Sequence, residues 1–179
     1  MLKIVAFAAS SSRQSINKKL VTYATSLIVN ASVEILDLND YEMPLFSQDR
    51  ENELGHPQLA YDFLDKIAGA DALVISFAEH NSSYSAAYKS LFDWCSRINT
   101  KVFQDKPMVM LSTAPGARGG KSVLEQALSS APRFTGQVKA SLSVPHFHDN
   151  FDVEQGVLTN ETLRLELLAA VNSLQSSDN

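Results

Sequence analysis

The sequence contains a single cysteine, Cys95, so no disulfide can form within the chain. Such cysteine usage fits a reducing compartment and favours the cytoplasm. Cys95 itself is interpreted either as a reactive thiol or as a small buried apolar residue. No apolar run approaches the roughly 18 residues that a membrane helix needs, and the first residues already show a strand pattern. We therefore expect neither a membrane span nor a signal peptide.

Positive charge is also scarce. Lysine and arginine number 15 against 20 aspartates and glutamates, which gives a net charge of -5. Duplex nucleic-acid binders usually carry a basic face, so no nucleic-acid partner is expected. With 45% hydrophobic and 20% charged residues, the composition excludes a disordered, collagen-like or coiled-coil chain. The length of 179 residues predicts one domain over residues 1–179.

Short apolar runs alternate along the chain with longer stretches of helical periodicity. Strands are predicted over residues 2–8, 33–38, 72–77, 108–111 and 138–144, the last with the alternating polarity of an edge strand. Helices are predicted over residues 16–28, 59–68, 84–98, 123–131 and 163–174. The polar stretch 40–56 is predicted to be a long loop, and the tail 175–179 is predicted to fray.

Five β–α units in this order predict right-handed crossovers and a parallel sheet with helices on both faces. They fit the flavodoxin-like strand order 2-1-3-4-5, an α/β fold. In this order, ligands bind at the carboxyl ends of the strands, near the switch between the first and third strands. We therefore expect a ligand site among the loops that follow residues 8, 77 and 111.

The first of these loops is rich in hydroxyl groups and leads into a helix. It reads Ala9-Ser10-Ser11-Ser12-Arg13-Gln14-Ser15 and contains no glycine, so it is not the glycine-rich dinucleotide fingerprint. A helix start offers free N–H groups and partial positive charge, which together with hydroxyls suit a monophosphate. The alternative interpretation is that Ser15 is an ordinary N-cap and the other serines are solvated.

The second loop groups four polar residues: Glu79, His80, Asn81 and Tyr84. His80 is a candidate general base or proton donor, and a plain polar loop residue is the alternative. Glu79 is also compatible with a simple charge at a helix N-terminus. Their grouping beside the first loop is more suggestive of a site than any one of them.

The third loop, residues 112–122, holds three of the seven glycines, and glycine lets a backbone approach a ligand closely. It nearly matches the G-x-x-x-x-G-K-[ST] loop of nucleoside triphosphatases, but Pro115 stands where the first glycine belongs. A tight turn into the next helix is the alternative. Further on, His146, His148 and Asp149 lie close together without a supporting cysteine or glutamate cluster, so we expect exposed loop histidines and no metal.

Together the three segments resemble the NADPH-dependent FMN reductases, a flavodoxin-like family that includes quinone, azo-dye and chromate reductases. The second segment carries the most specific likeness. From Glu79 to Trp94 it is similar to the family's E-Y-N-G-S-Y-P-G-A-L-K-N-A-I-D-W, with His80 in place of the tyrosine. The third segment, from Lys106 onward, is similar to K-P…S-x-x-P-G-G-R-G-G.

The first loop carries the weakest likeness. Anchored on Ser15 and Asn17, it is similar to the family's G-S-x-R-x-x-S-x-N phosphate loop. Ala9 replaces the glycine, Ser12 takes the arginine position, and Arg13 follows one residue late.

The resemblance implies an enzyme that passes hydride from NADPH or NADH to FMN and then two electrons to a small quinone-, azo- or flavin-type acceptor. It implies FMN contacts from Ser10, Ser12, Arg13, Ser15, Ile16 and Asn17 in the first segment, from Glu79, His80, Asn81 and Tyr84 in the second, and from the stretch 112–116, including Ser112, Thr113 and Gly116. No dedicated acid–base residue is expected beyond His80. A homodimer or homotetramer is also implied, in which Tyr88, Phe92 and Trp94 either contribute to the contact or simply form the core.

Three other functions stay open. A flavodoxin-like electron carrier would bind FMN without oxidising NAD(P)H itself. A triphosphatase would bind a nucleoside triphosphate with magnesium and would be colourless. A domain that has lost its cofactor would serve in assembly, and the departures at Ala9 and Ser12 fit that interpretation.

Overall fold

The computed structural model describes residues 1–175. Most of the tail that was predicted to fray, residues 176–179, lies outside the described residues. Five parallel strands form one sheet in the order β2-β1-β3-β4-β5. They are β1 (Leu2–Ala9), β2 (Ala31–Leu36), β3 (Ala72–Phe77), β4 (Pro107–Thr113) and β5 (Gln137–Val144). The flavodoxin-like order 2-1-3-4-5 is therefore confirmed.

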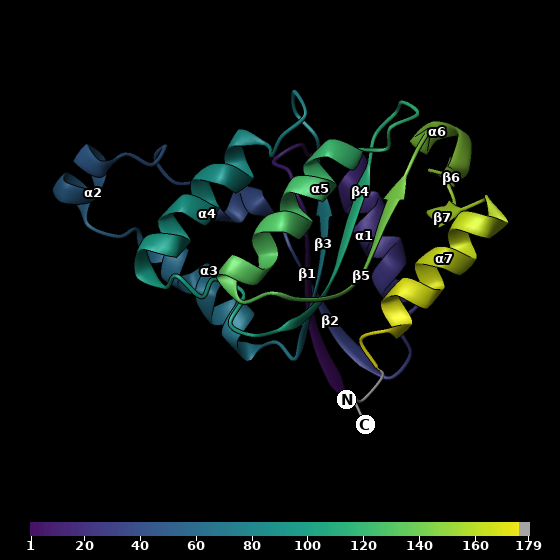
Figure 1. The fold of residues 1–179 in the computed structure, drawn as a ribbon, viewed down its shortest axis with the longest axis horizontal. Helices are drawn as coiled ribbons and strands as arrows, with labels where there is room; N and C mark the ends of the chain where they lie inside the picture. The colour runs from purple at the N-terminus through teal and green to yellow at the C-terminus, as the bar shows by residue number, and fades with distance from the viewer. Residues whose placement is uncertain (176–179) are drawn as a thin grey trace.

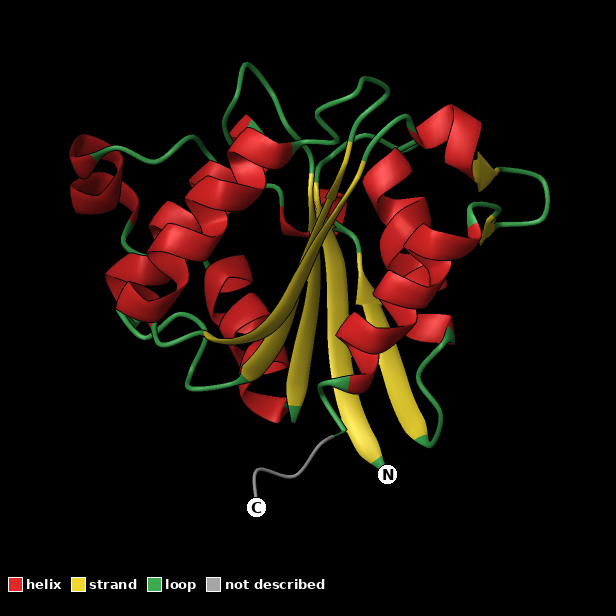
Figure 2. Cartoon of the chain, turned by 45° about the vertical axis from the view of Figure 1, so that its right-hand side comes forward, coloured by secondary structure: helices red, strands yellow, loops and turns green. Residues whose placement is uncertain are grey.

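Helices cover both faces of the sheet (Figures 1 and 2). The helices α3 (Gln58–Gly69), α4 (Ala86–Ile98) and α5 (Lys121–Ser130) pack on one face, and α1 (Ile16–Ser26) and α7 (Glu161–Asn172) on the other. Side chains of β1 alternate between the two cores: Val5 and Phe7 face α3 and α4, whereas Ile4 and Ala6 face α1 and α7. This explains why the strand is apolar at successive positions.

The second strand begins and ends two residues earlier than predicted. The apolar pattern extends to Leu38, which is indeed buried, but Leu38 belongs to the short 3-10 helix η1 (Leu38–Tyr41). Asp37 starts this helix, because its carboxylate accepts a hydrogen bond from the Asn39 amide at 3.0 Å.

The prediction of a structureless loop over residues 40–56 is wrong. The helix α2 (Gln48–Leu54) lies within it, as the outermost helix in Figure 1. It buries none of its residues, so it has no apolar stripe for the periodicity to reveal. Its N-cap, Ser47, accepts a hydrogen bond from Arg50 N at 3.2 Å, and Glu51 accepts one from Arg97 Nε of α4 at 2.9 Å.

The stretch after β5 also holds structure beyond the prediction. The helix α6 (Phe147–Asn150) leads into a hairpin of β6 (Phe151–Asp152) and β7 (Val157–Leu158), and the rings of Phe147 and Phe151 stack at 4.7 Å. His146 and His148 are exposed, as predicted. Within residues 1–175, no group of three or more histidine, cysteine, aspartate or glutamate side chains is placed to hold a metal ion.

The sequence left open whether three aromatic residues of α4 form the core or a subunit contact, and the structure places two of them in the core. Trp94 and Tyr88 are buried inside the chain, whereas Phe92 is only half-buried. Cys95 is buried beside them, and its burial raises the pKa of the thiol to about 12. The interpretation of Cys95 as a small buried residue is thus confirmed. No helix of residues 1–175 has both the length and the apolar character for a membrane crossing.

Candidate active site

The loops that follow β1, β3 and β4 come together at one end of the sheet (Figure 2). They border an open hollow of about 220 Å³, which we call the switch-point hollow. Its lining residues are Ser10, Ser12, Gln14, Ser15, Ile16, Asn17, Ala78, Glu79, His80, Thr113, Ala114 and Pro115. Of these, Gln14 and Ala78 were not predicted, although each lies within or directly before a loop expected to form the site.

The N-terminus of α1 points its first amides toward this hollow. Ser15 is the N-cap, and its Oγ accepts a hydrogen bond from Lys18 N at 3.2 Å. Ile16 and Asn17 are the first two helical residues, so their N–H groups have no partner within the helix. The first turn contains no acidic residue. A partial positive charge therefore faces the hollow, and no carboxylate in the first turn of α1 itself neutralises it.

Hydroxyl groups beside this helix start retain hydrogen atoms to donate. Ser10 is buried, and its Oγ accepts a hydrogen bond from the Ser12 amide at 3.1 Å. Because Ser10 and Ser15 both serve the fold as acceptors, their O–H hydrogens stay available to a bound anion. Ser12 and Arg13 are exposed, and Arg13 does not line the hollow.

The Asn17 side chain is occupied by internal hydrogen bonds. It is 2% exposed, its Nδ2 donates to Thr113 O at 3.2 Å, and its Oδ1 accepts from Thr113 N at 3.0 Å. The Ser76 hydroxyl donates to the same Oδ1 at 2.8 Å. The Asn17 amide thus joins the start of α1 to the ends of β3 and β4, and only its backbone N–H is free for a ligand.

Glu79 connects the second loop to the third. Its Oε2 accepts a hydrogen bond from Val123 N at 2.9 Å, in the first turn of α5. A carboxylate at this position satisfies an otherwise unpaired amide and complements the helix dipole. The sequence allowed Glu79 to be a charge at a helix N-terminus, but the helix that it caps, α5, lies in a different β–α unit.

The tip of the second loop is a tight turn. The backbones of His80 and Ser83 exchange two hydrogen bonds, of 2.9 and 3.1 Å, and the two residues between them have positive φ values, 50° for Asn81 and 64° for Ser82. This is the type I′ geometry, which usually selects glycine at its second position. His80 lines the switch-point hollow, whereas Asn81 is exposed at the tip and does not.

Tyr84 lies away from the switch-point hollow. It is half-buried, its hydroxyl lies 3.2 Å from Ser130 Oγ, and burial raises its pKa. Its ring lines a separate, largely aromatic cavity between α4 and α5, together with Tyr88, Phe92 and Phe134.

The predicted residues of the third loop mainly hold its shape. Ser112 Oγ donates to Gly119 O at 2.8 Å, and Thr113 Oγ1 donates to Val144 O at 2.7 Å. The Gly116 carbonyl accepts from His146 N at 3.0 Å. Gly119 has a φ of 59°, and a Cβ there would lie 2.5 Å from Ser143 Oγ, so this position requires glycine.

The triphosphatase motif does not form a phosphate cradle at the switch-point hollow. Lys121 and Ser122 are absent from its lining, and the Ser122 hydroxyl accepts a hydrogen bond from Arg118 at 2.7 Å. The donors around the hollow are the serine hydroxyls and first amides of α1, a set matched to a monophosphate. The residues present therefore fit the phosphate of a mononucleotide.

Several known proteins are similar to this chain in sequence or in fold. The chain is 28% identical to an NADPH:quinone oxidoreductase of Arabidopsis thaliana, over 98% of this chain and 91% of that protein. It is 27% identical to a quinone reductase of Escherichia coli, over 92% of each chain. The solved structure of FerB, a flavoenzyme NAD(P)H:(acceptor) oxidoreductase from Paracoccus denitrificans, shares the fold with a TM-score of 0.79 and 19% identity, covering 98% of both chains.

Most of the chain also matches the model of one protein family. The model of the NADPH-dependent FMN reductases matches residues 2–149, which include all three loops of the switch-point hollow. The chain therefore belongs to the NADPH-dependent FMN reductase family.

Proposed function

We propose that the switch-point hollow holds FMN and that the protein is an NAD(P)H-dependent reductase. The observation that carries this proposal is the convergence of the α1 N-terminus with the loops after β3 and β4 on one hollow. The phosphate would bind to the hydroxyls of Ser10, Ser12 and Ser15 and to the amides of Ile16 and Asn17. Membership of the family supports FMN as the cofactor and NAD(P)H as the reductant.

The flavin, when bound, supplies hydride acceptance from NADPH or NADH and two-electron delivery to an acceptor. The chain binds and orients it. The backbone of Glu79 and His80 would border the ring on one side, and residues 112–116 on the other, each held by the hydrogen bonds described above. The His80 imidazole, exposed at the rim, is the proposed proton donor.

The proposed acceptors are small quinone-, azo- or flavin-type molecules. Support comes from the names of two relatives described above, the NADPH:quinone oxidoreductase of Arabidopsis thaliana and the quinone reductase of Escherichia coli. We propose the cytoplasm as the compartment, since the single cysteine is buried and no disulfide supports the fold.

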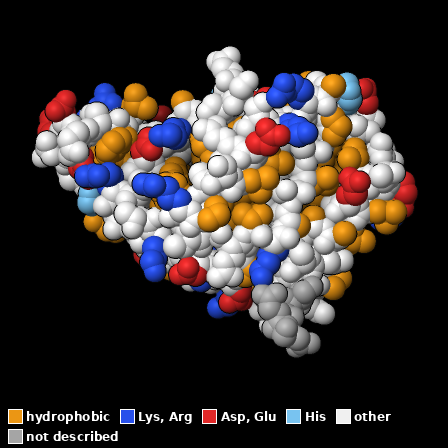
Figure 3. Space-filling model, viewed as in Figure 1, with side chains coloured by type: hydrophobic (Ala, Val, Ile, Leu, Met, Phe, Trp, Pro, Cys, Tyr) orange, Lys and Arg blue, Asp and Glu red, His pale blue; other side chains and the backbone are white. Residues whose placement is uncertain are grey.

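We further propose a homodimer or homotetramer assembled through the face that carries α4 and α5. Figure 3 shows hydrophobic side chains gathered near the centre of this face. Phe92, Phe134 and Tyr84 line its cavity of about 250 Å³. These three side chains are half-buried, and contiguous apolar surface of this kind often marks protein contacts. Light scattering after size exclusion tests the assembly, and a monomer at micromolar concentration would contradict it.

The reductase proposal is tested with the purified protein, saturated with FMN and freed of excess flavin. Anaerobic NADPH, and then NADH, is added while the visible spectrum is recorded. Bleaching of bound flavin by either nucleotide, followed by recovery on adding a benzoquinone, is the expected result. Bound flavin that neither nucleotide reduces would instead indicate an electron carrier, and absence of flavin binding would contradict the site itself.

A further inference from the structure

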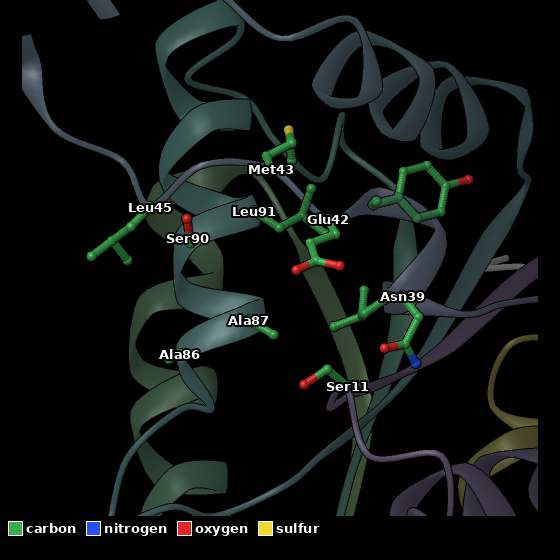
Figure 4. Close-up of a pocket in the computed structure, with 11 residues that line it drawn as sticks. Ser11, Asn39, Glu42, Met43, Leu45, Ala86, Ala87, Ser90 and Leu91 are labelled. Atoms are coloured by element: carbon green, nitrogen blue, oxygen red, sulfur yellow. The ribbon is translucent and has the colours of Figure 1, made fainter. Parts of the chain in front are cut away.

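A second hollow adjoins the first loop from the other side (Figure 4). It has a volume of about 280 Å³ and lies between residues 38–45, which follow β2, and the first turns of α4. We call it the Glu42 hollow. Ser11 lines it, whereas Ser10 and Ser12 line the switch-point hollow, so successive serines of one loop face two different cavities.

The walls of the Glu42 hollow combine apolar and polar groups in nearly equal measure. Leu38, Met43 and Leu91 contribute large side chains, and α4 presents Ala86 and Ala87 there. The two alanines leave space that larger residues on this helix face would fill. A cavity of this size is just below the roughly 300–1,000 Å³ typical of sites for drug-sized ligands, so it suits a molecule with one ring.

Two of the polar groups around the hollow already have partners. Asn39 Nδ2 donates to Asp37 Oδ1 at 2.7 Å, and Ser90 Oγ accepts from Phe46 N at 3.3 Å. The Glu42 carboxylate differs from them. Within residues 1–175 it makes no hydrogen bond or ion pair, and Figure 4 shows it extending toward α4 across the hollow.

In the described part of the chain, no lysine or arginine pairs with this carboxylate. Neither lysine nor arginine lines the hollow, and two lysines of the surrounding elements are already paired, Lys18 with Asp37 and Lys66 with Glu34. Arg50 donates to the Leu45 carbonyl but is not itself a lining residue. The charge therefore disfavours an anion in the hollow and favours a cation.

We propose that the Glu42 hollow binds a small organic cation in which one aromatic ring carries an alkylammonium group. The ring would lie against Leu38, Met43 and Leu91, and the ammonium would pair with the Glu42 carboxylate. Ser11 lines the same hollow, and its hydroxyl would accept a further hydrogen bond from the ammonium. This site is separate from the switch-point hollow, and the proposal does not depend on flavin binding.

Two probes of similar shape and opposite charge test the proposal: 2-phenylethylammonium and 3-phenylpropionate. Each is titrated into the full-length protein labelled with ¹⁵N, and the backbone amide shifts of Ala86, Ala87 and Ser90 are followed. The cation is expected to shift these amides saturably, and the anion is expected to leave them unchanged at the same concentration. Equal shifts from both probes, or none from either, would overturn the proposal.

Two variants locate the binding. Glu42→Gln is expected to weaken the cation about threefold, in line with the strength of a partly exposed ion pair. Ala87→Leu fills the hollow without harming the helix and is expected to abolish the shifts. Unchanged affinity in both variants would place binding elsewhere. FMN retention and its reduction by NADPH are measured on the same samples, so failure of the reductase proposal is seen separately from failure of this one.

Discussion

The side-chain amide of Asn17 forms a two-way hydrogen-bonded pair with the backbone of Thr113, 96 residues away along the chain. Nδ2 donates to the Thr113 carbonyl at 3.2 Å, and Oδ1 accepts from its amide at 3.0 Å. The Asn17 side chain thus pairs with both backbone groups of the last residue of β4, as the backbone of a neighbouring strand would. The start of α1, which lines the switch-point hollow, is thereby fixed relative to the third loop.

Replacing this residue should destabilise the protein strongly. Asn17→Ala leaves the buried Thr113 backbone and the Ser76 hydroxyl without partners, and we expect a loss of about 3 kcal/mol in the free energy of unfolding. Urea unfolding followed by circular dichroism measures it. Asn52→Ala, on the exposed surface of α2, is the control and should change stability by no more than about 0.5 kcal/mol. Similar values for the two variants would contradict the structural role.

Glu79 offers a second test of how the loops are connected. Glu79→Ala removes the carboxylate that caps α5, and a loss of about 1 kcal/mol is expected. Glu79→Gln keeps an acceptor oxygen and should lose about half as much, because only the interaction with the helix dipole disappears. Glu125→Ala, exposed on the same helix, is the matched control. If it destabilises α5 as much as Glu79→Ala does, the cap is not responsible.

The turn at the tip of the second loop carries strain that one substitution should relieve. Ser82 has a φ of 64°, and glycine adopts this conformation without a steric penalty. Ser82→Gly is expected to stabilise the protein by about 0.5 kcal/mol, visible as a higher Tm. Asn81→Gly, in the same turn, should gain less, because asparagine tolerates the left-handed region better than serine. An unchanged or lower Tm for Ser82→Gly would argue against this turn geometry.

Acid should weaken the attachment of η1 to α1. The Lys18 ammonium and the Asn39 amide hold the pKa of Asp37 at about 2, below its ordinary 3.8. The folded state therefore binds this proton less readily than the unfolded state, so the stabilisation is present above pH 4 and is lost as the pH falls toward 2.

Urea unfolding between pH 5 and pH 2 measures this dependence. Asp37→Asn should flatten the decline of unfolding free energy in that window, whereas Asp65→Asn, exposed on α3, should leave it as in the wild type. A wild-type slope in the Asp37 variant would show that this carboxylate does not carry the effect.

The fold was predictable where burial repeats along the chain. β3 is buried at every position and lies in the centre of the sheet, so its six apolar or small residues leave little ambiguity. α2 lies at the opposite extreme, since it packs no side chain into the core. Its signals were local and polar: Ser47 as N-cap and the first-turn acids Asp49 and Glu51.

The site was predictable as a set of loops but not as individual contacts. Strand order alone indicates that the loops after β1, β3 and β4 meet, and they do. Which atoms face the ligand depends on partners far away in sequence. Asn17 and Glu79 both lie in the expected place, yet their side chains bond to Thr113 and Val123. A motif specifies residue types and spacing, and it cannot distinguish a ligand contact from a hydrogen bond that holds the loops together.

The most direct test of the proposed phosphate site compares the binding of FMN with that of riboflavin, which differ only in the phosphate. Both are titrated into flavin-free protein, and quenching of flavin fluorescence gives the two dissociation constants. Hydrogen bonds to a charged group contribute roughly 1.5–3 kcal/mol each, so FMN should bind at least about tenfold more tightly. Equal affinities for the two flavins would contradict a phosphate site at the start of α1.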